Sequence, residues 1–168
     1  MVTLALLSIT GCSEQAKWNR SQRQSMREAL RQYRRMLYLN NLTDAEFMLF
    51  TDDVALALEE DYPVYTSFIK MPGVNDTVQV YVVTTIVEEL DADARNMRHI
   101  FPYRYLVSEG ILPDRLTHEQ QRDFYRCLAQ KVDNTFPTVE TFLLALATDS
   151  TATSKITKLQ AQCANELF

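Results

Sequence analysis

The stretch from Thr77 to Met97 constrains the fold of this chain more than any other segment. Its first half is largely apolar, and a stripe from Val83 to Phe101 then continues in alternating steps of four and three residues, like one face of a helix. Residues 78–86 also alternate and are rich in β-branched side chains, which is typical of a strand. We favour a helix, because the pattern runs on to His99 and is too long for an ordinary strand.

Glycine is scarce, with only 3 in 168 residues, which favours helices over a turn-rich β protein. A chain of this length is one domain by default. We therefore predict an all-α fold: a single helical-bundle domain of about seven helices around a central apolar helix near 77–98.

Helix starts are marked by Ser or Thr followed three residues later by Glu or Gln. The chain has three such capping boxes: Ser21 with Gln24, Thr43 with Glu46, and Thr117 with Gln120. We expect the first of these helices to run from 21 to about 40 and the second, which is acidic, from 44 to about 60.

Residues 2–10 form an apolar run that is too short to span a bilayer and suits the core of a signal peptide. The end of this run and the two residues after it, Ile9-Thr10-Gly11-Cys12, resemble the lipobox of bacterial lipoproteins, in which the final Cys receives the lipid. The resemblance covers only the first dozen residues and lacks the Lys or Arg that usually precedes the run. The alternative is a buried N-terminal helix with an incidental cysteine.

The lipobox resemblance implies that Cys12 is lipidated and that the mature chain lies in the bacterial cell envelope, facing the periplasm or the cell exterior. Ser13, rather than Asp, follows the cysteine, which favours the outer membrane over the inner in enteric bacteria. The chain then divides into a signal segment (1–12), a tether (13–20) and one helical domain (21–168).

Charge is unevenly distributed: residues 17–35 carry +6, and the remainder carries −11. Four arginines of the first helix follow helical spacing: Arg20, Arg23, Arg27 and Arg31. Beside a lipid anchor, such a helix would face anionic headgroups. The alternative is that it pairs with the acidic helix 44–60. The net charge of −5 gives no general reason to expect nucleic-acid binding, and we predict none.

Acid–base or cation chemistry is best served by Glu89 and Asp93, which lie four apart and would share a helix face. The favoured alternative is a solvated face, because acidic residues here alternate with Arg95 and Arg98. No glycine-rich phosphate loop or zincin pattern occurs in the sequence, and we predict no cofactor and no metal site.

The corner formed by Tyr103, Arg104 and Tyr105 offers two rings and a cation that could line a small-ligand pocket. The favoured alternative is a helix corner whose aromatic rings fill the core.

Cys127 and Cys163 each lie nine residues into a predicted helix, with one further helix between those two. The first and third helices of such a series run parallel, so both sulfurs sit about 13.5 Å along their helices, at similar heights. A disulfide is therefore geometrically possible. Two buried free thiols are the alternative that we favour.

Taken together, these features predict a lipid-anchored extracytoplasmic helical protein that binds or scaffolds a protein partner. The alternatives are a periplasmic small-ligand receptor using Tyr103–Tyr105 and an enzyme with an acidic site near Glu89 and Asp93. We favour a non-enzymatic role, because the motifs expected of common catalytic sites are missing from the sequence.

Overall fold

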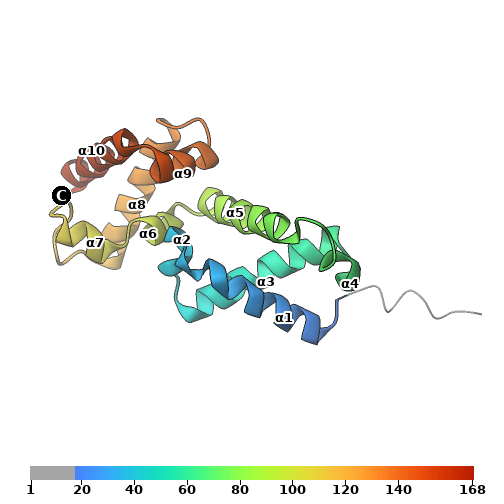
Figure 1. Ribbon diagram of the computed structural model, residues 1–168. Helices are drawn as coiled ribbons and strands as arrows, with labels where there is room; N and C mark the ends of the chain where they lie inside the picture. The colour runs from blue at the N-terminus through green and yellow to red at the C-terminus, as the bar shows by residue number, and fades with distance from the viewer. Residues whose placement is uncertain (1–17) are drawn as a thin grey trace, which may run out of the picture.

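The computed structural model describes residues 18–168, and this part of the chain is helical without strands, which confirms the predicted all-α class (Figure 1). Helices α4, α6 and α7 and the 3-10 helices are short, so the described residues contain more helices than we expected. In chain order the elements are α1 (Arg20–Leu30), η1 (Arg31–Arg35), α2 (Leu37–Asn40), α3 (Asp44–Asp61), α4 (Tyr65–Phe68), α5 (Val74–Ala92), η2 (Ala94–Asn96), α6 (Met97–Ile100), α7 (Tyr103–Ser108), α8 (His118–Asp133), α9 (Val139–Thr148) and α10 (Ser150–Leu167).

The central segment is the helix α5 rather than a strand, and it packs against α3 and α9. It ends earlier than the apolar stripe predicts. Asp93 is extended (φ −147°), and its side chain accepts a hydrogen bond from the backbone nitrogen of Arg95. Asp93 thereby caps the start of η2. The Asn96 amide donates to the carbonyl of Glu89 at 2.7 Å and satisfies one of the last carbonyls of α5.

The predicted helix from 21 to 40 is wrong in its continuity. Its capping box is Asn19 with Gln22 instead of Ser21 with Gln24, and the α-helix ends at Leu30. After η1, Met36 is extended and redirects the chain into α2. Tyr38 and Leu39 are buried there, whereas a straight helix would turn Leu39 away from its apolar stripe.

Trp18, the first of the described residues, lies inside the segment we expected to be a tether. Its side chain is only 3% exposed, and the indole nitrogen donates to the carbonyl of Tyr62 at 2.8 Å. The ring also packs against Tyr65 and Phe68, with centroid distances of 4.9 and 5.7 Å. Trp18 therefore belongs to the helical domain rather than to a tether.

Figure 1 shows α1, α3 and α5 in one part of the molecule and α8, α9 and α10 in the other, with α2 and α6 between them. Contacts of α2 with α6, α6 with α8, and α5 with α9 connect the two parts. The buried side chains form one continuous cluster, which extends from Trp18 to Ala164.

Candidate functional site

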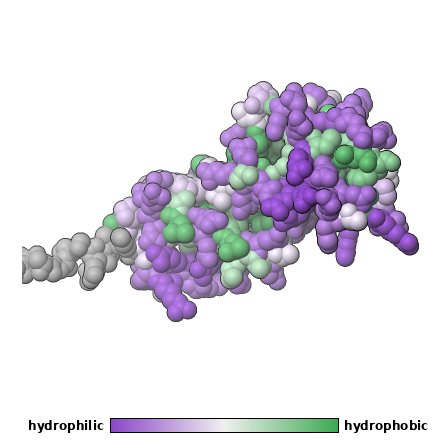
Figure 2. Space-filling model, turned by 180° about the vertical axis from the view of Figure 1, so that it is seen from behind, coloured by the Kyte–Doolittle hydropathy of each residue, from purple (hydrophilic) through white to green (hydrophobic). Residues whose placement is uncertain are grey.

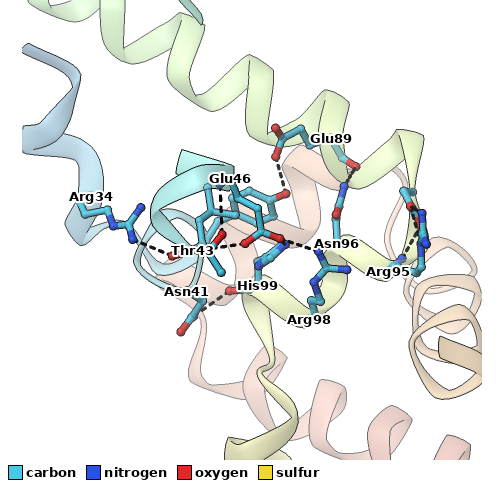
Figure 3. Close-up of polar contacts among 12 residues, drawn as sticks. Arg34, Asn41, Thr43, Glu46, Glu89, Arg95, Asn96, Arg98 and His99 are labelled. Carbon is cyan, nitrogen blue, oxygen red and sulfur yellow. Dashed lines mark hydrogen bonds and ion pairs between the residues drawn. The ribbon is translucent and has the colours of Figure 1, made fainter. Parts of the chain in front are cut away.

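A polar cluster lies where α2, α3, α5 and α6 meet (Figure 3). Thr43 and Glu46 form the predicted capping box at the start of α3, with 2.7 Å between the Thr43 nitrogen and the Glu46 carboxylate. The other oxygen of Glu46 accepts a hydrogen bond from Arg98 at 2.8 Å and lies 3.8 Å from Nε2 of His99. Glu46 thereby ties the start of α3 to α6.

The charges in this cluster follow from burial and hydrogen bonding. Burial acts to raise the pKa of Glu46, but hydrogen bonds from Thr43 and Arg98 outweigh it and lower the pKa to about 2. Burial lowers the pKa of His99, and the neighbouring Arg98 cation lowers it further. His99 is therefore neutral at neutral pH, and its approach to Glu46 is not an ion pair under those conditions.

Tyr38 joins the cluster from α2, and its hydroxyl donates to a carboxylate oxygen of Glu89 at 2.6 Å. Burial raises the pKa of Tyr38, and the hydrogen bond to Glu89 adds to this increase. Burial also raises the pKa of Glu89, although the hydrogen bond from Tyr38 acts to lower it. The Tyr38 ring stands edge-on to His99, with centroids 5.2 Å apart.

Glu89 and Asp93 do not share one helix face as expected, because α5 ends between them at Ala92. The solvated face that we favoured is also wrong for Glu89, which is only partly exposed. Glu89 turns to Tyr38, while Asp93 pairs with Arg95. The contacts of this polar cluster fasten helices to one another, and the hollows described below are lined by other residues. We therefore assign these contacts to the architecture of the fold.

At the predicted corner, Tyr103 has a structural partner on each side of its hydroxyl. The hydroxyl donates to the Pro113 carbonyl at 2.5 Å and accepts from the Leu116 nitrogen at 3.0 Å, which fastens the loop before α8. Arg104 and Tyr105 are exposed at the surface. The three side chains are thus not gathered around a common hollow among those described here.

A disulfide joins Cys127 of α8 to Cys163 of α10, with 5.9 Å between the Cα atoms. The two helices pack against each other. The interpretation that we favoured, two buried free thiols, is therefore wrong. The sequence placed the two sulfurs at similar heights but left open whether α8 and α10 touch.

The arginines of α1 and of the start of η1 divide into two kinds. Arg23 makes two hydrogen bonds to the Glu59 carboxylate, at 2.7 and 2.8 Å, and Arg27 is paired with Asp52. Arg20 and Arg31 lie exposed. The basic helix therefore uses Arg23 and Arg27 against the acidic helix α3, as the second of the two sequence interpretations requires.

A groove of about 570 Å³ runs between α1–η1 and α3. We call it the arginine groove; its lining residues are Gln24, Arg27, Glu28, Arg31, Arg34, Asp44, Phe47, Met48 and Thr51. A second hollow of about 700 Å³ adjoins it and shares two of these residues; it is lined by Arg20, Ser21, Arg23, Gln24 and Arg27. The concave surface is basic along α1 and apolar at Phe47 and Met48 of α3.

Arg34 closes one end of the arginine groove. Its guanidinium lies 4.5 Å from the ring centroid of Phe47 and donates to the Leu42 carbonyl at 2.7 Å. A weaker contact reaches Asp44 at 3.3 Å. These contacts hold both the cation and the ring in place before any ligand arrives.

The apolar surface of α3 continues beside the groove. Met48, Leu49 and Leu56 are 54%, 62% and 58% exposed. On the face shown in Figure 2, apolar surface occurs as separate patches in mostly hydrophilic surroundings. Sequence reasoning identified the arginines but missed Phe47 and Met48, because their helix carries apolar residues on most of its faces and no stripe singles them out.

Within residues 18–168, no three His, Cys, Asp or Glu side chains are grouped so as to hold a metal ion. In the same range, no helix is both long and apolar enough to cross a membrane. The predicted lipidation site at Cys12 lies outside the described residues. Comparison with known proteins finds no match: neither a family model, nor a curated protein, nor a solved structure is similar to this chain.

Proposed function

We propose that this chain is a lipid-anchored extracytoplasmic protein that acts as a binding module and holds a protein partner at the membrane. The observation that carries the proposal is the arginine groove, a recessed surface with arginines along one wall and Phe47 and Met48 on the other. Exposed apolar side chains rimmed by polar groups are typical of sites that bind another macromolecule.

Two independent features support a location outside the cytoplasm. One is the lipobox-like sequence that ends at Cys12. The other is the disulfide between Cys127 and Cys163, because disulfides persist in oxidising compartments and are rare in the cytosol. With Ser13 after the lipidated residue, we place the anchor in the outer membrane rather than the inner.

The distance from anchor to fold supports a role at the membrane surface. Six residue steps separate Cys12 from the buried Trp18, and an extended chain spans at most about 3.6 Å per residue, or about 20 Å in all. A lipid on Cys12 would thus keep the arginine groove, which begins near the start of α1, close to the headgroups.

The location is tested with Cys12→Ala, in cells fed a fatty-acid probe. We expect this variant to lose the label and to leave the membrane fraction, whereas the matched control Ser13→Ala keeps both. Normal labelling of Cys12→Ala would refute the anchor.

The binding role is tested with a photo-crosslinking amino acid at Met48 in the arginine groove. The control places the same amino acid at Gln162, which is exposed on α10. We expect crosslinked protein species from position 48 and not from position 162. If neither position, or both equally, gives adducts, the groove is not the binding site.

A further inference from the structure

The walls of the arginine groove have the spacing of two helix ridges. Residues 24, 27, 28 and 31 line one wall, and residues 44, 47, 48 and 51 line the other, so each wall follows steps of three and four. Seven residues of helix correspond to about 10 Å. The groove is therefore about 10 Å long and continues into the second hollow, which gives room for a short stretch of chain.

The lining of the groove carries three arginines against two acids, Glu28 and Asp44, so its net charge is positive. Arg27 is paired with Asp52, and Arg34 is held by the Leu42 carbonyl. Arg31 instead has only a 3.5 Å contact with Glu28, and its side chain is 70% exposed, so this ion pair is weak. Arg31 therefore keeps most of its donors for an incoming group.

The second hollow continues the basic wall toward the start of α1. Arg20 and Arg23 line it, so arginines recur along the whole wall from Arg20 to Arg34. Guanidinium groups bind carboxylates in a planar, two-pronged geometry. The opposite wall presents Phe47 and Met48, which bind apolar side chains, between Asp44 and Thr51.

From these contacts we propose that the arginine groove binds an acidic, amphipathic segment of a partner protein. Its carboxylates would face the arginine wall, and its apolar side chains would cover Phe47 and Met48. This inference rests on the proposed binding function. A polypeptide segment fits better than a bilayer, because a planar array of headgroups cannot enter a recessed channel.

The probe is a synthetic helical peptide of about three turns, with Glu on one face and Leu on the other, labelled with a fluorophore. The matched control peptide has Gln in place of each Glu. Binding to the full-length protein in detergent is followed by anisotropy at low and high salt. The protein variants are Arg31→Glu and Met48→Asp in the groove, and Arg115→Glu as an exposed control outside it. Circular dichroism verifies that each variant is folded.

We expect the acidic peptide to bind, the Gln peptide to bind much more weakly, and salt to weaken the acidic complex. Arg31→Glu and Met48→Asp should each reduce affinity by about fivefold or more, and Arg115→Glu should leave it unchanged. Equal binding of the two peptides, or no loss with either groove variant, would overturn the proposal.

Anionic phosphatidylglycerol vesicles are tested with a protein whose Cys12 is replaced by Ala. Vesicle binding that is lost with Arg31→Glu, without peptide binding, would assign the groove to the membrane surface instead.

Protein adducts at position 48 together with no preference for the acidic peptide would refute only the partner's chemistry. The absence of those adducts would refute the proposed binding function itself.

Discussion

Tyr38 and Glu89, which lie 51 positions apart, are joined by a hydrogen bond of 2.6 Å between phenol and carboxylate. The bond connects α2 to α5 and depends on the break at Met36 that turns Tyr38 inward. Glu89 is half-buried and its pKa is raised, so the folded protein binds the proton of this carboxyl more tightly than the unfolded chain does.

Tyr38→Phe should lower the free energy of unfolding by about 1.5–3 kcal/mol at pH 7, because it removes the donor to a partly buried charge. Glu89→Gln should instead be neutral or slightly stabilising at pH 7, because the amide oxygen still accepts from Tyr38 and no charge is buried. The stability advantage of this variant should shrink as the pH falls toward 4.5, because the native Glu89 carboxyl takes up its proton before the unfolded one does. Urea unfolding at several pH values measures both effects; strong destabilisation by Glu89→Gln at pH 7 would contradict this account.

Glu46 should make the protein sensitive to acid in a defined range. Its pKa is about 2 in the fold against an ordinary value of 4.5, so its stabilising charge is fully present above pH 4.5 and is lost as the pH falls toward 2. Glu46→Gln keeps an acceptor for the capping box but loses the charge facing Arg98. We expect this variant to lose less stability than the native protein between pH 4.5 and 2, as measured by thermal melting.

The control for Glu46 separates charge from capping. Glu46→Ala removes both and should cost up to about 1 kcal/mol more than Glu46→Gln at pH 7. The lowered pKa of His99 adds a second acid effect. Below about pH 6.5 the unfolded chain binds a proton at His99 more readily than the native protein does, so stability falls. Identical acid profiles for the native protein and Glu46→Gln would contradict the assigned role.

The disulfide should contribute strongly to stability, because Cys127 and Cys163 are separated by 36 positions. Chain-entropy reasoning gives up to about 4 kcal/mol for a loop of this length. Cys127→Ala and Cys163→Ala should therefore lower the melting temperature to a similar extent, and reduction should do the same in the native protein. Intact mass after alkylation with and without prior reduction gives an independent measurement. Two thiols labelled without reduction would rule the bond out.

Arg27→Glu should lower the free energy of unfolding by about 1 kcal/mol, because it loses the ion pair with Asp52 and places two acids together. Adding Asp52→Arg should recover part of this loss by restoring an opposite pair. Arg115→Glu, at an exposed position, should change stability by less than about 0.5 kcal/mol. If the charge swap recovers nothing in chemical denaturation, Arg27 does not stabilise the contact between α1 and α3.

The sequence by itself determined the elements whose causes are local. Scarce glycine and long periodic stretches predicted an all-α chain, and the capping boxes at Thr43 and Thr117 are present as predicted, since each needs only residues within one turn. The helical pattern of residues 78–90 was readable for the same reason: its period is a property of the helix alone.

Tertiary structure decided the breaks and the pairings. The apolar stripe does not reveal that α5 ends at Ala92, because its spacing continues past this residue. Asp93 ends the helix and caps η2, and the chain then continues in a new direction. The break at Met36 is favoured by burial of Tyr38 and Leu39 against distant helices, and Trp18 is fixed by its contact with Tyr62. Met48 and Arg31 line one groove only because α1 and α3 pack side by side, and their distance in space is not encoded in the spacing of either helix.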